Sequence, residues 1–392
     1  MHGLYDGSYQ TKTNSGDIFT SVKIKQVENI IQKQYYHFSE KSRQEIEDGV
    51  ISSLVNSLGD KHSSYFNIKD AKDFSEVLRG DFEGIGAVID EDIKGIIIRK
   101  VFDGSPAQKA GLKSGDIMTH VGGESMIGLS TEEAVKKIRG PKGSKVKITY
   151  IHTDKDVKNE VEIIRDTVFI PSAAEKMLTG SIGYIEVASF GEHTTEEFQK
   201  SFQNLTNSGA KGIILDFRNN GGGYLDTAVD ILSFLLPEKS TAVITRENSK
   251  NSQITLFTKQ NKFTNTNIPV VMLINELSAS ATEITAGALQ DFGRAIILGE
   301  KSYGKGSVQE PFALDDGSML KITIGKWYTP KDRGIDGVGI TPDVIIPILT
   351  KDFANSYDRQ FEGAKKALDL LIKNENSIEK TKLELKSMDF IK

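Results

Sequence analysis

The sequence contains no cysteine, and histidine is scarce, with six residues among 392. Without cysteine the chain can form no disulfide, no thiolate nucleophile and no cysteine-based zinc or iron–sulfur site. The formal net charge of −5 argues against a broad surface for nucleic acid or for an anionic membrane. No segment approaches the ~20 consecutive apolar residues of a membrane span. We therefore expect a globular protein that needs neither a metal nor an organic cofactor.

The chain also begins without the features of an export signal. Its opening stretch, MHGLYDGSYQTKTNSGD, is polar and has neither a basic n-region nor an apolar h-region. We expect a soluble chain as written, and a truncated form would look the same. The absence of cysteine does not fix the compartment.

Four regions follow one another along the chain. Residues 17–78 place apolar side chains three and four apart, which predicts helices. Residues 79–166 turn to short β-branched runs around one amphipathic helix, which we expect Thr131 to cap, in a unit of small β-barrel size. Residues 167–350 alternate apolar strands, among them AVIT, with helices, so we expect an α/β core with parallel strands. Residues 351–392 predict a helix and a charged tail.

A serine lies at one strand-to-helix junction of the predicted core. The strand IPVVMLIN runs into SASATEITAG, and the helix is expected to begin at or near Ser280. A hydroxyl there faces free N–H groups and the positive end of the helix dipole, and the Ala281 amide is one natural oxyanion donor. The alternative is that Ser278 or Ser280 only caps the helix, which is the usual role of serine at such a position.

A serine nucleophile needs a base, and Lys305 in GEKSYGKGSVQ is the better candidate. It lies between Gly304 and Gly306, and it can accept a proton if burial lowers its pKa well below ~10.4. Gln309, four residues on, should share its face and orient the amine without adding negative charge. The alternatives are a surface lysine in a glycine turn, or His193 as the base in a Ser–His hydrolase of small esters.

A glycine-rich turn follows another apolar strand, in GIILDFRNNGGGYL. Exposed N–H groups in the run 221–223 could supply a second oxyanion donor, although a tight turn needing positive φ is the simpler explanation. Two segments come close to nucleotide-binding motifs but do not match them. GEKSYGKGS has Gly306 where a phosphate loop needs a hydroxyl, and Gly84-Ile85-Gly86 lacks the third glycine of a dinucleotide fingerprint.

Taken in order, these segments resemble the carboxyl-terminal processing proteases, also called tail-specific proteases. DKHSSYF resembles the end of the family's N-terminal helical segment, and FEGIGAVI, SPAQKAGLKSGDIMTHVGGE and IRGPKGS resemble its PDZ domain. GYIEVASF, LDFRNNGGG, SASATE, GKGSVQ and GVGITPD follow as the protease-core motifs. The resemblance covers nearly the whole chain.

The resemblance implies a serine endopeptidase with Ser280 as nucleophile, Lys305 as general base and Gln309 as its support. It places the oxyanion hole at the Ala281 amide and at a glycine amide of the run 221–223, of which we favour Gly222. Two substitutions depart from the family, and neither removes a chemical group: Gly221 stands where proline is common, and Thr282 where serine is common.

The resemblance further implies that the PDZ-like unit binds protein or peptide C-terminal tails. Amides around Gly84, Ile85 and Gly86 would hold the terminal carboxylate while the peptide adds as a strand. Arg139 either couples this unit to the core through a salt link or is simply solvated. The family implies an extracytoplasmic location, a homodimer through the N- and C-terminal helices, and regulation by PDZ movement or a partner. The alternative function is a PDZ peptide-binding module with an inactive or partner-gated core.

Overall fold

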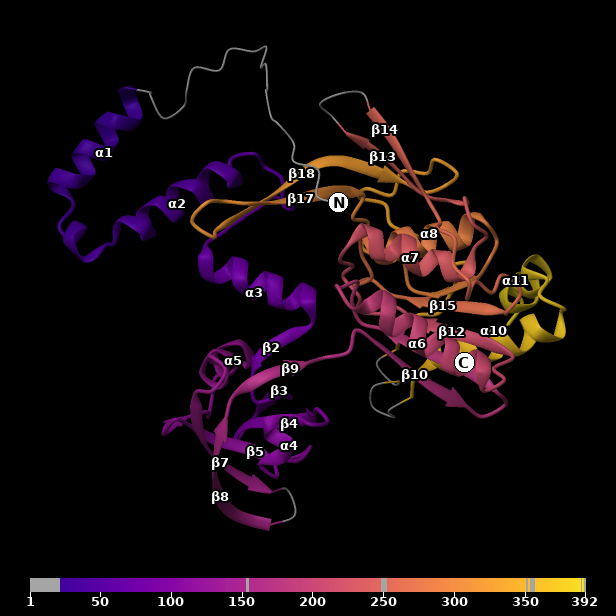
Figure 1. The fold of residues 1–392 in the computed structure, drawn as a ribbon, viewed down its shortest axis with the longest axis horizontal. Coiled ribbons are helices and arrows are strands. Elements are labelled where there is room, and N and C mark those ends of the chain that lie inside the picture. Colours follow the sequence, from indigo (N-terminus) through magenta and orange to yellow (C-terminus); the bar gives the residue numbers. More distant parts are fainter. Residues whose placement is uncertain are drawn as a thin grey trace.

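The computed structural model describes residues 22–152, 155–247, 252–349, 352, 357–388 and 390. Residues 1–21, which include the opening polar stretch and the start of the predicted helical region, and parts of the tail after residue 349 lie outside these ranges. An N-terminal arm, a PDZ-like unit and an α/β core follow in order (Figure 1). Within the described ranges, no helix is long and apolar enough to cross a bilayer.

The N-terminal arm is helical, as its spacing predicts. Ser42 begins the second helix with a capping box, because its hydroxyl accepts from the Glu45 amide while the Glu45 carboxylate accepts from the Ser42 amide. The first helix buries none of its residues. The elements of the arm are α1 (Val22–Gln34), η2 (Phe38–Glu40), α2 (Arg43–Asn56), β1 (Ser64–Phe66) and α3 (Ile68–Arg79).

The PDZ-like unit is an antiparallel sheet closed by two helices around an aliphatic core. The sheet runs β3-β4-β5-β7-β8, so β3 is an edge strand, and β6 pairs with β5. Its elements are β3 (Ala87–Asp92), β4 (Gly95–Val101), α4 (Pro106–Lys109), β5 (Ile117–Val121), β6 (Glu124–Ser125), α5 (Thr131–Ile138), β7 (Lys145–His152) and β8 (Lys155–Ile164).

Two short strands carry the chain into this unit and out of it. β2 (Asp81–Gly84) pairs antiparallel with β9 (Asp166–Phe169), and the Ile170 amide donates to the Gly80 carbonyl at 2.8 Å. The two ends of the unit therefore meet in a two-stranded stem.

The cap of α5 differs from the expectation. Ser130, and not Thr131, is the N-cap, because the Ser130 hydroxyl accepts from the Glu133 amide and the Glu133 carboxylate accepts from the Ser130 amide. The reciprocal pair needs glutamate three residues after the cap, a spacing that only Ser130 satisfies.

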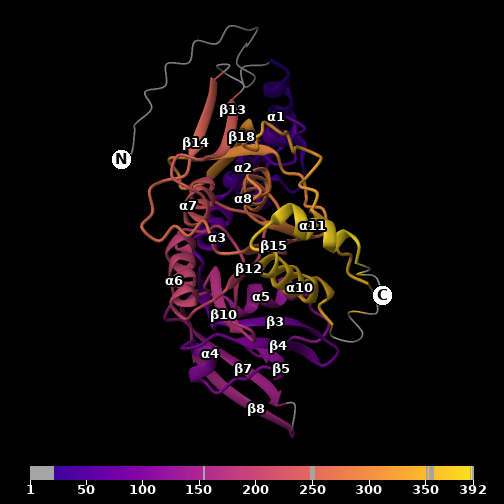
Figure 2. The same cartoon turned by 90° about the vertical axis from the view of Figure 1, so that its right-hand side faces the viewer.

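The core contains the expected parallel strands. The sheet order is β10-β11-β12-β15-β16-β19, with all neighbours parallel except β10 and β11. Ile213 and Leu215 pack on the side of α6, α7 and α8, whereas Ile214 packs on the side of α10. Alternate residues thus bury both faces of the sheet. Figure 2 shows α6 and α7 on one side of β12 and β15, and α10 and α11 on the other. The strands are β10 (Ala173–Leu178), β11 (Ile182–Val187), β12 (Gly212–Asp216), β15 (Val270–Ile274), β16 (Ile296–Gly299) and β19 (Val344–Ile345); the helices are α6 (Thr194–Asn207), α7 (Leu225–Leu235), α8 (Ala281–Asp291), α10 (Arg359–Lys373) and α11 (Ile378–Lys386).

A second sheet of the core is antiparallel and contains the AVIT strand, which therefore does not join the parallel sheet. Its order is β1-β18-β13-β14, with β17 also paired to β18. The pairing of β1 with β18 brings the N-terminal arm onto the core, because Ser64 lies opposite Lys321. Its remaining strands are β13 (Thr241–Glu247), β14 (Ser252–Phe257), β17 (Ser307–Ala313) and β18 (Met319–Tyr328).

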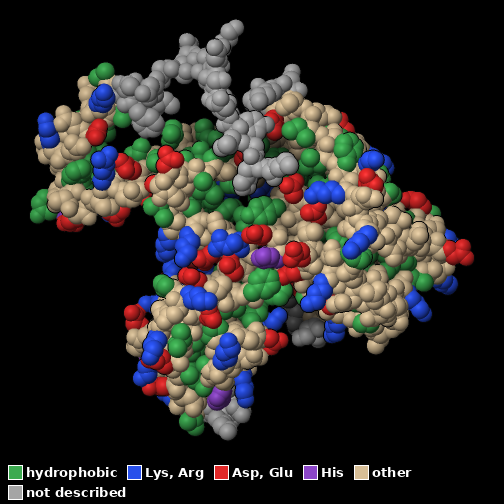
Figure 3. Space-filling view, in the orientation of Figure 1, with side chains coloured by type: hydrophobic (Ala, Val, Ile, Leu, Met, Phe, Trp, Pro, Cys, Tyr) green, Lys and Arg blue, Asp and Glu red, His purple; other side chains and the backbone are tan. Residues whose placement is uncertain are grey.

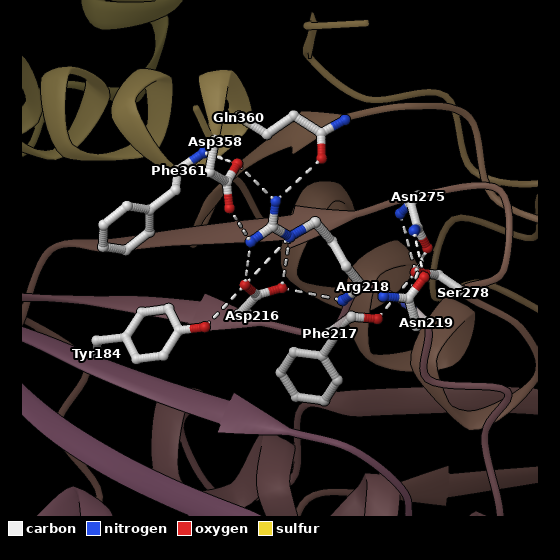
Figure 4. A network of polar contacts seen from close by, with 10 residues as sticks. All are labelled: Tyr184, Asp216, Phe217, Arg218, Asn219, Asn275, Ser278, Asp358, Gln360 and Phe361. Atoms are coloured by element: carbon white, nitrogen blue, oxygen red, sulfur yellow. Dashed lines mark hydrogen bonds and ion pairs between the residues drawn. The ribbon is translucent and has the colours of Figure 1, made fainter. Parts of the chain in front are cut away.

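An ion-pair network fixes the carboxyl end of β12 to the C-terminal helix α10 (Figure 4). Asp216 accepts from the Tyr184 hydroxyl at 2.9 Å and from Arg218 Nε at 2.9 Å. The two terminal nitrogens of Arg218 each donate at 2.8 Å to Asp358, whose carboxylate also caps α10 through the Phe361 amide. The Arg218 side chain is only 15% exposed and that of Asp216 only 6%. The network therefore anchors the start of the glycine-rich turn.

We predict that Arg218→Met lowers the free energy of unfolding by about 3 kcal/mol, because it leaves the Asp216 carboxylate buried without its cation. Lys259→Met is the control, since its 58%-exposed lysine pairs with Asp230 at the surface of the same core, and it should cost about 1 kcal/mol at most. Urea unfolding of the intact chain compares the two. Equal costs would contradict a structural role for the network.

Candidate active site

Ser280 lies where the loop after β15 enters α8, as the sequence predicts. Its backbone has φ 57° and ψ −117°, a conformation that costs free energy for a residue with a side chain. The helix begins at Ala281, and the Ser280 side chain remains partly accessible. Such a turn presents the hydroxyl at the N-terminal end of the helix.

Ser278 is the other serine of the junction, and its hydroxyl is fully used inside the protein. It is 0% exposed, donates to the Phe217 carbonyl at 2.9 Å and accepts from the Asn275 amide at 3.0 Å. Asn275 also exchanges two hydrogen bonds with Asn219, from the Asn219 amide and to the Asn219 side-chain oxygen (Figure 4). These contacts hold the serine junction against the glycine-rich turn.

The glycine-rich turn packs directly on Ser280. A Cβ atom placed on Gly222, whose φ is +99°, would lie 2.8 Å from Ser280 Cβ and 3.0 Å from the Ala281 nitrogen, so only glycine fits. Within the described part of the chain, the Ala281 amide donates to no acceptor. The Gly222 amide, however, donates to the buried side-chain oxygen of Asn220 at 2.8 Å. Of the two expected oxyanion donors, only Ala281 is free in this structure.

Lys305 lies in the loop between β16 and β17, and it is half-buried. Its glycine neighbours are required by close packing, since a Cβ on Gly304 would lie 2.9 Å from the Gly339 nitrogen and one on Gly306 would lie 2.6 Å from the Asp336 nitrogen. Burial lowers the pKa of Lys305, and the nearby Lys321 cation lowers it further.

The structure does not join the three expected catalytic side chains by hydrogen bonds. Among the described residues, no hydrogen bond links the Lys305 amine to the Ser280 hydroxyl. The Gln309 amide donates to Ser307 Oγ at 2.7 Å and to Thr323 Oγ1 at 3.2 Å, and not toward the lysine.

A buried carboxylate that the sequence analysis missed lies between the serine and the lysine. Glu283, in the first turn of α8, is 0% exposed. It accepts from the backbone amides of both Ser280 and Lys305. The spacing Ser-x-x-Glu from Ser280 to Glu283 fits a capping box and could have indicated the first contact. Nothing in the local sequence indicates the second.

The N-terminal segment DKHSSYF also reaches the lysine, which the sequence did not indicate. Burial opposes ionisation of Asp60, but hydrogen bonds from Ser63 and Thr323 lower its pKa to about 2. Burial lowers the pKa of His62, and the positive charge of Lys305 lowers it further. Asp60 and His62 are thus close enough to exchange charge effects with the lysine.

His193, the alternative base, packs against Phe169 of β9. It is exposed at the start of α6, and its ring packs edge-on against Phe169 with centroids 5.5 Å apart. No hydrogen bond between described residues connects it to Ser280. The geometry therefore gives no support to a Ser–His hydrolase.

The PDZ-like unit has a cavity between the edge strand β3 and the helix α5. Gly84, Ile85 and Gly86 line its end, and apolar side chains of β3 and α5 line its walls. Arg139 lies at the same end, with its guanidinium 4.6 Å from the centre of the Phe82 ring. The salt link from Arg139 to the core does not form between described residues. Arg139 is instead part of the cavity.

Comparison with known proteins agrees with both units. Residues 181–346 match the model of peptidase family S41, and residues 74–151 match that of the PDZ domain. Carboxy-terminal processing protease CtpB of Bacillus subtilis is 37% identical over 332 residues, which are 83% of this chain and 67% of that protein. The carboxy-terminal-processing protease of Bartonella bacilliformis is 33% identical over 355 residues, 90% of this chain and 78% of that protein.

CtpA of Bacillus subtilis is 36% identical over 315 residues, 80% of this chain and 66% of that protein, so the chain spans about two thirds of the length of its Bacillus relatives. In fold, the chain is similar to a solved structure assigned to S41 from Bacteroides fragilis, with TM-score 0.57 and 15% identity over 97% of this chain and all of that one. The chain belongs to the carboxy-terminal processing proteases, the PDZ-containing serine-type peptidases of family S41.

Proposed function

We propose that this chain is an endopeptidase in which Ser280 is the nucleophile and Lys305 the general base. The main support is the position of Ser280, whose hydroxyl lies at the start of α8 beside the free Ala281 amide. The half-buried lysine with a lowered pKa supports the second role, because a lower pKa increases the fraction of neutral amine, and only the neutral amine can accept a proton.

In the proposed reaction, Ser280 Oγ attacks a peptide carbonyl while its proton passes to the neutral amine of Lys305. The C–N bond then breaks, and the protonated lysine returns the proton to the leaving amine. Water, deprotonated by the same lysine, hydrolyses the acyl-enzyme. The Ser280 and Lys305 side chains must first rotate toward each other, because no hydrogen bond joins these two described residues.

The Ala281 amide would donate to the oxyanion throughout the reaction. Gly222 becomes the second donor only when its amide leaves the Asn220 side chain. Gln309 likewise orients the lysine only when its amide leaves Ser307 and Thr323. Both roles are therefore proposals that require local rearrangement.

We propose that the PDZ cavity selects substrates by their free C-terminus. The substrate would add as a strand to the unpaired edge of β3, with its carboxylate at the amides around Gly84, Ile85 and Gly86. Arg139 at that end of the cavity supplies a positive charge. The second candidate, a tail-binding protein with a partner-gated core, is favoured by the lack of a hydrogen bond between serine and lysine.

Two further proposals rest chiefly on the family. An extracytoplasmic location is one of them. The other is a homodimer through the terminal helices, for which the arm offers apolar side chains, with Val27 50%, Ile30 61% and Ile31 45% exposed on α1. Figure 3 shows apolar and charged side chains side by side on the surface of the arm.

We predict that Ser280→Ala and Lys305→Ala each reduce peptide cleavage by at least ~10³-fold, because each removes a group that acts in the same proton transfer. Lys301→Ala is the matched control, since this lysine lies exposed on the same loop and should retain activity. Initial rates with a purified peptide substrate measure the effect. Substantial activity in both variants would exclude the dyad.

We predict that kcat/KM rises with pH through the pKa of Lys305, below the usual 10.5 of a lysine, because only the neutral amine accepts a proton. Lys321→Gln removes a like charge, so the pKa of Lys305 should increase and the rising limb should move to higher pH. Lys326→Gln, an exposed position on the same strand, should leave the limb in place. A limb that Lys321→Gln leaves unmoved or shifts to lower pH would contradict the role of Lys305.

We predict that amidation of the substrate C-terminus lowers kcat/KM about tenfold or more, because charge-assisted hydrogen bonds to the carboxylate are lost. Paired peptides that differ only in the terminal group provide the measurement. Equal rates would remove tail recognition from the mechanism, while cleavage of both peptides without any partner would exclude the gated alternative.

A further inference from the structure

Glu283 receives four hydrogen bonds through its two carboxylate oxygens. Oε2 accepts from the Ser280 and Lys305 amides, both at 2.9 Å. Oε1 accepts from Ser302 Oγ at 2.5 Å and from the Gly304 amide at 2.7 Å. A single oxygen atom thus bridges the backbones of the proposed nucleophile and the proposed base.

This set of contacts exceeds what a helix cap requires. A capping box consists of two reciprocal bonds, and only one of them, from the amide of the cap residue, uses the glutamate carboxylate. The other three donors come from the loop 302–305, which connects β16 of the parallel sheet to β17 of the antiparallel sheet. A buried carboxylate is costly unless its oxygens are satisfied, so the loop and the helix hold each other through Glu283.

The loop held by Glu283 is in turn fixed on both sides. Ser302 Oγ accepts from the Ile340 amide at 2.6 Å. The Tyr303 amide donates to the Ser278 carbonyl at 3.0 Å. The lysine loop is therefore joined to the serine junction twice, through the Glu283 carboxylate and through the Tyr303 amide.

Glu283 is also a charge near the lysine. Among the described residues it forms no ion pair, so its negative charge is held only by neutral donors. Lys305 feels this charge together with those of Lys321 on β18 and of Asp60 in the N-terminal turn, and Lys305 in turn lowers the pKa of the neighbouring His62. Both carboxylates raise the pKa of Lys305, against burial and Lys321, which lower it.

We propose that Glu283 is a positioning residue for the dyad, which holds the Ser280 junction and the Lys305 loop in one geometry and supplies part of the field at the lysine. The inference rests on the proposed roles of Ser280 and Lys305. It adds a residue that touches neither the substrate nor the reacting atoms, and whose removal should alter both the rate and its pH dependence.

The test measures how fast Ser280 in the full chain reacts with a fluorophosphonate between pH 5 and 11, with mass spectrometry to identify the modified serine. Glu283→Gln should slow the reaction at least ~10-fold, because an amide cannot accept from all four donors. The pH at which the labelling rate of Glu283→Gln rises should also be lower than in the wild type by about one unit, because a negative charge near the lysine is lost. A purely structural role would not produce that acid shift.

Glu283→Asp keeps the negative charge, but its shorter side chain withdraws the carboxylate from the four donors. It should therefore slow the labelling, while the rising limb of the pH–rate profile stays in place. Asp291→Asn is the control, because Asp291 is a 9%-exposed carboxylate on the same helix that binds the Lys331 amide and Arg333, away from the dyad. It should change neither quantity. Thermal unfolding of each variant checks that the fold is retained.

The proposal would be overturned if Glu283→Gln had the labelling rate and the pH–rate profile of the wild type, or if its rising limb moved to higher pH. If Glu283→Gln does not fold, Glu283→Asp decides, and an unchanged rate in that variant would overturn it. If Lys305→Ala reacts with the fluorophosphonate as fast as the wild-type chain does, the proposed dyad is overturned, and this inference with it. Failure of the dyad is therefore distinguishable from failure of Glu283 alone.

Discussion

The proposed chemistry depends on one physical constraint, the partial removal of the Lys305 amine from water. Lys305 is surrounded by parts of the chain that are far apart in sequence: α8 with Glu283, strand β18 with Lys321, and the turn at Asp60 that β1 pins to β18. Burial favours the neutral amine, whereas the two carboxylates favour the charged one. The pKa of the lysine reflects a balance between these contributions, so the reactivity proposed for the amine depends on several distant elements at once.

The parallel sheet provides the rigid frame for this balance. The junctions after β12 and β15, and the loop after β16, all start at the same edge of the sheet, where side chains from successive connections meet. Hydrogen bonds such as those between Asn219 and Asn275 join the loop after β12 to the loop after β15. Arg218 extends the tie to α10 through Asp358. The site is therefore supported mostly by hydrogen bonds between loops, with the apolar sheet beneath them.

Local patterns in the sequence predicted the features that depend on neighbouring residues. The strand before Ser280, the helix after it and the glycines around Lys305 are of this kind. Predictions that needed a continuous element or long-range pairing did less well. Gln309 was expected to share a face with Lys305, but β17 begins only at Ser307 and has a bulge between Val308 and Gln309, which breaks the spacing. The sequence analysis grouped the AVIT strand with the strands of the parallel sheet, because apolar composition does not reveal which sheet a strand joins.

The stem formed by β2 and β9 places the first and last residues of the PDZ-like unit side by side, with Ile170 bonded to Gly80. A unit whose ends meet can be lost, gained or exchanged as a cassette without straining the chain on either side. The core would then keep its chemistry while a different inserted module chose what to present to it. If the PDZ-like unit selects substrates as proposed, the stem is the place where that selectivity could be exchanged without change to the core.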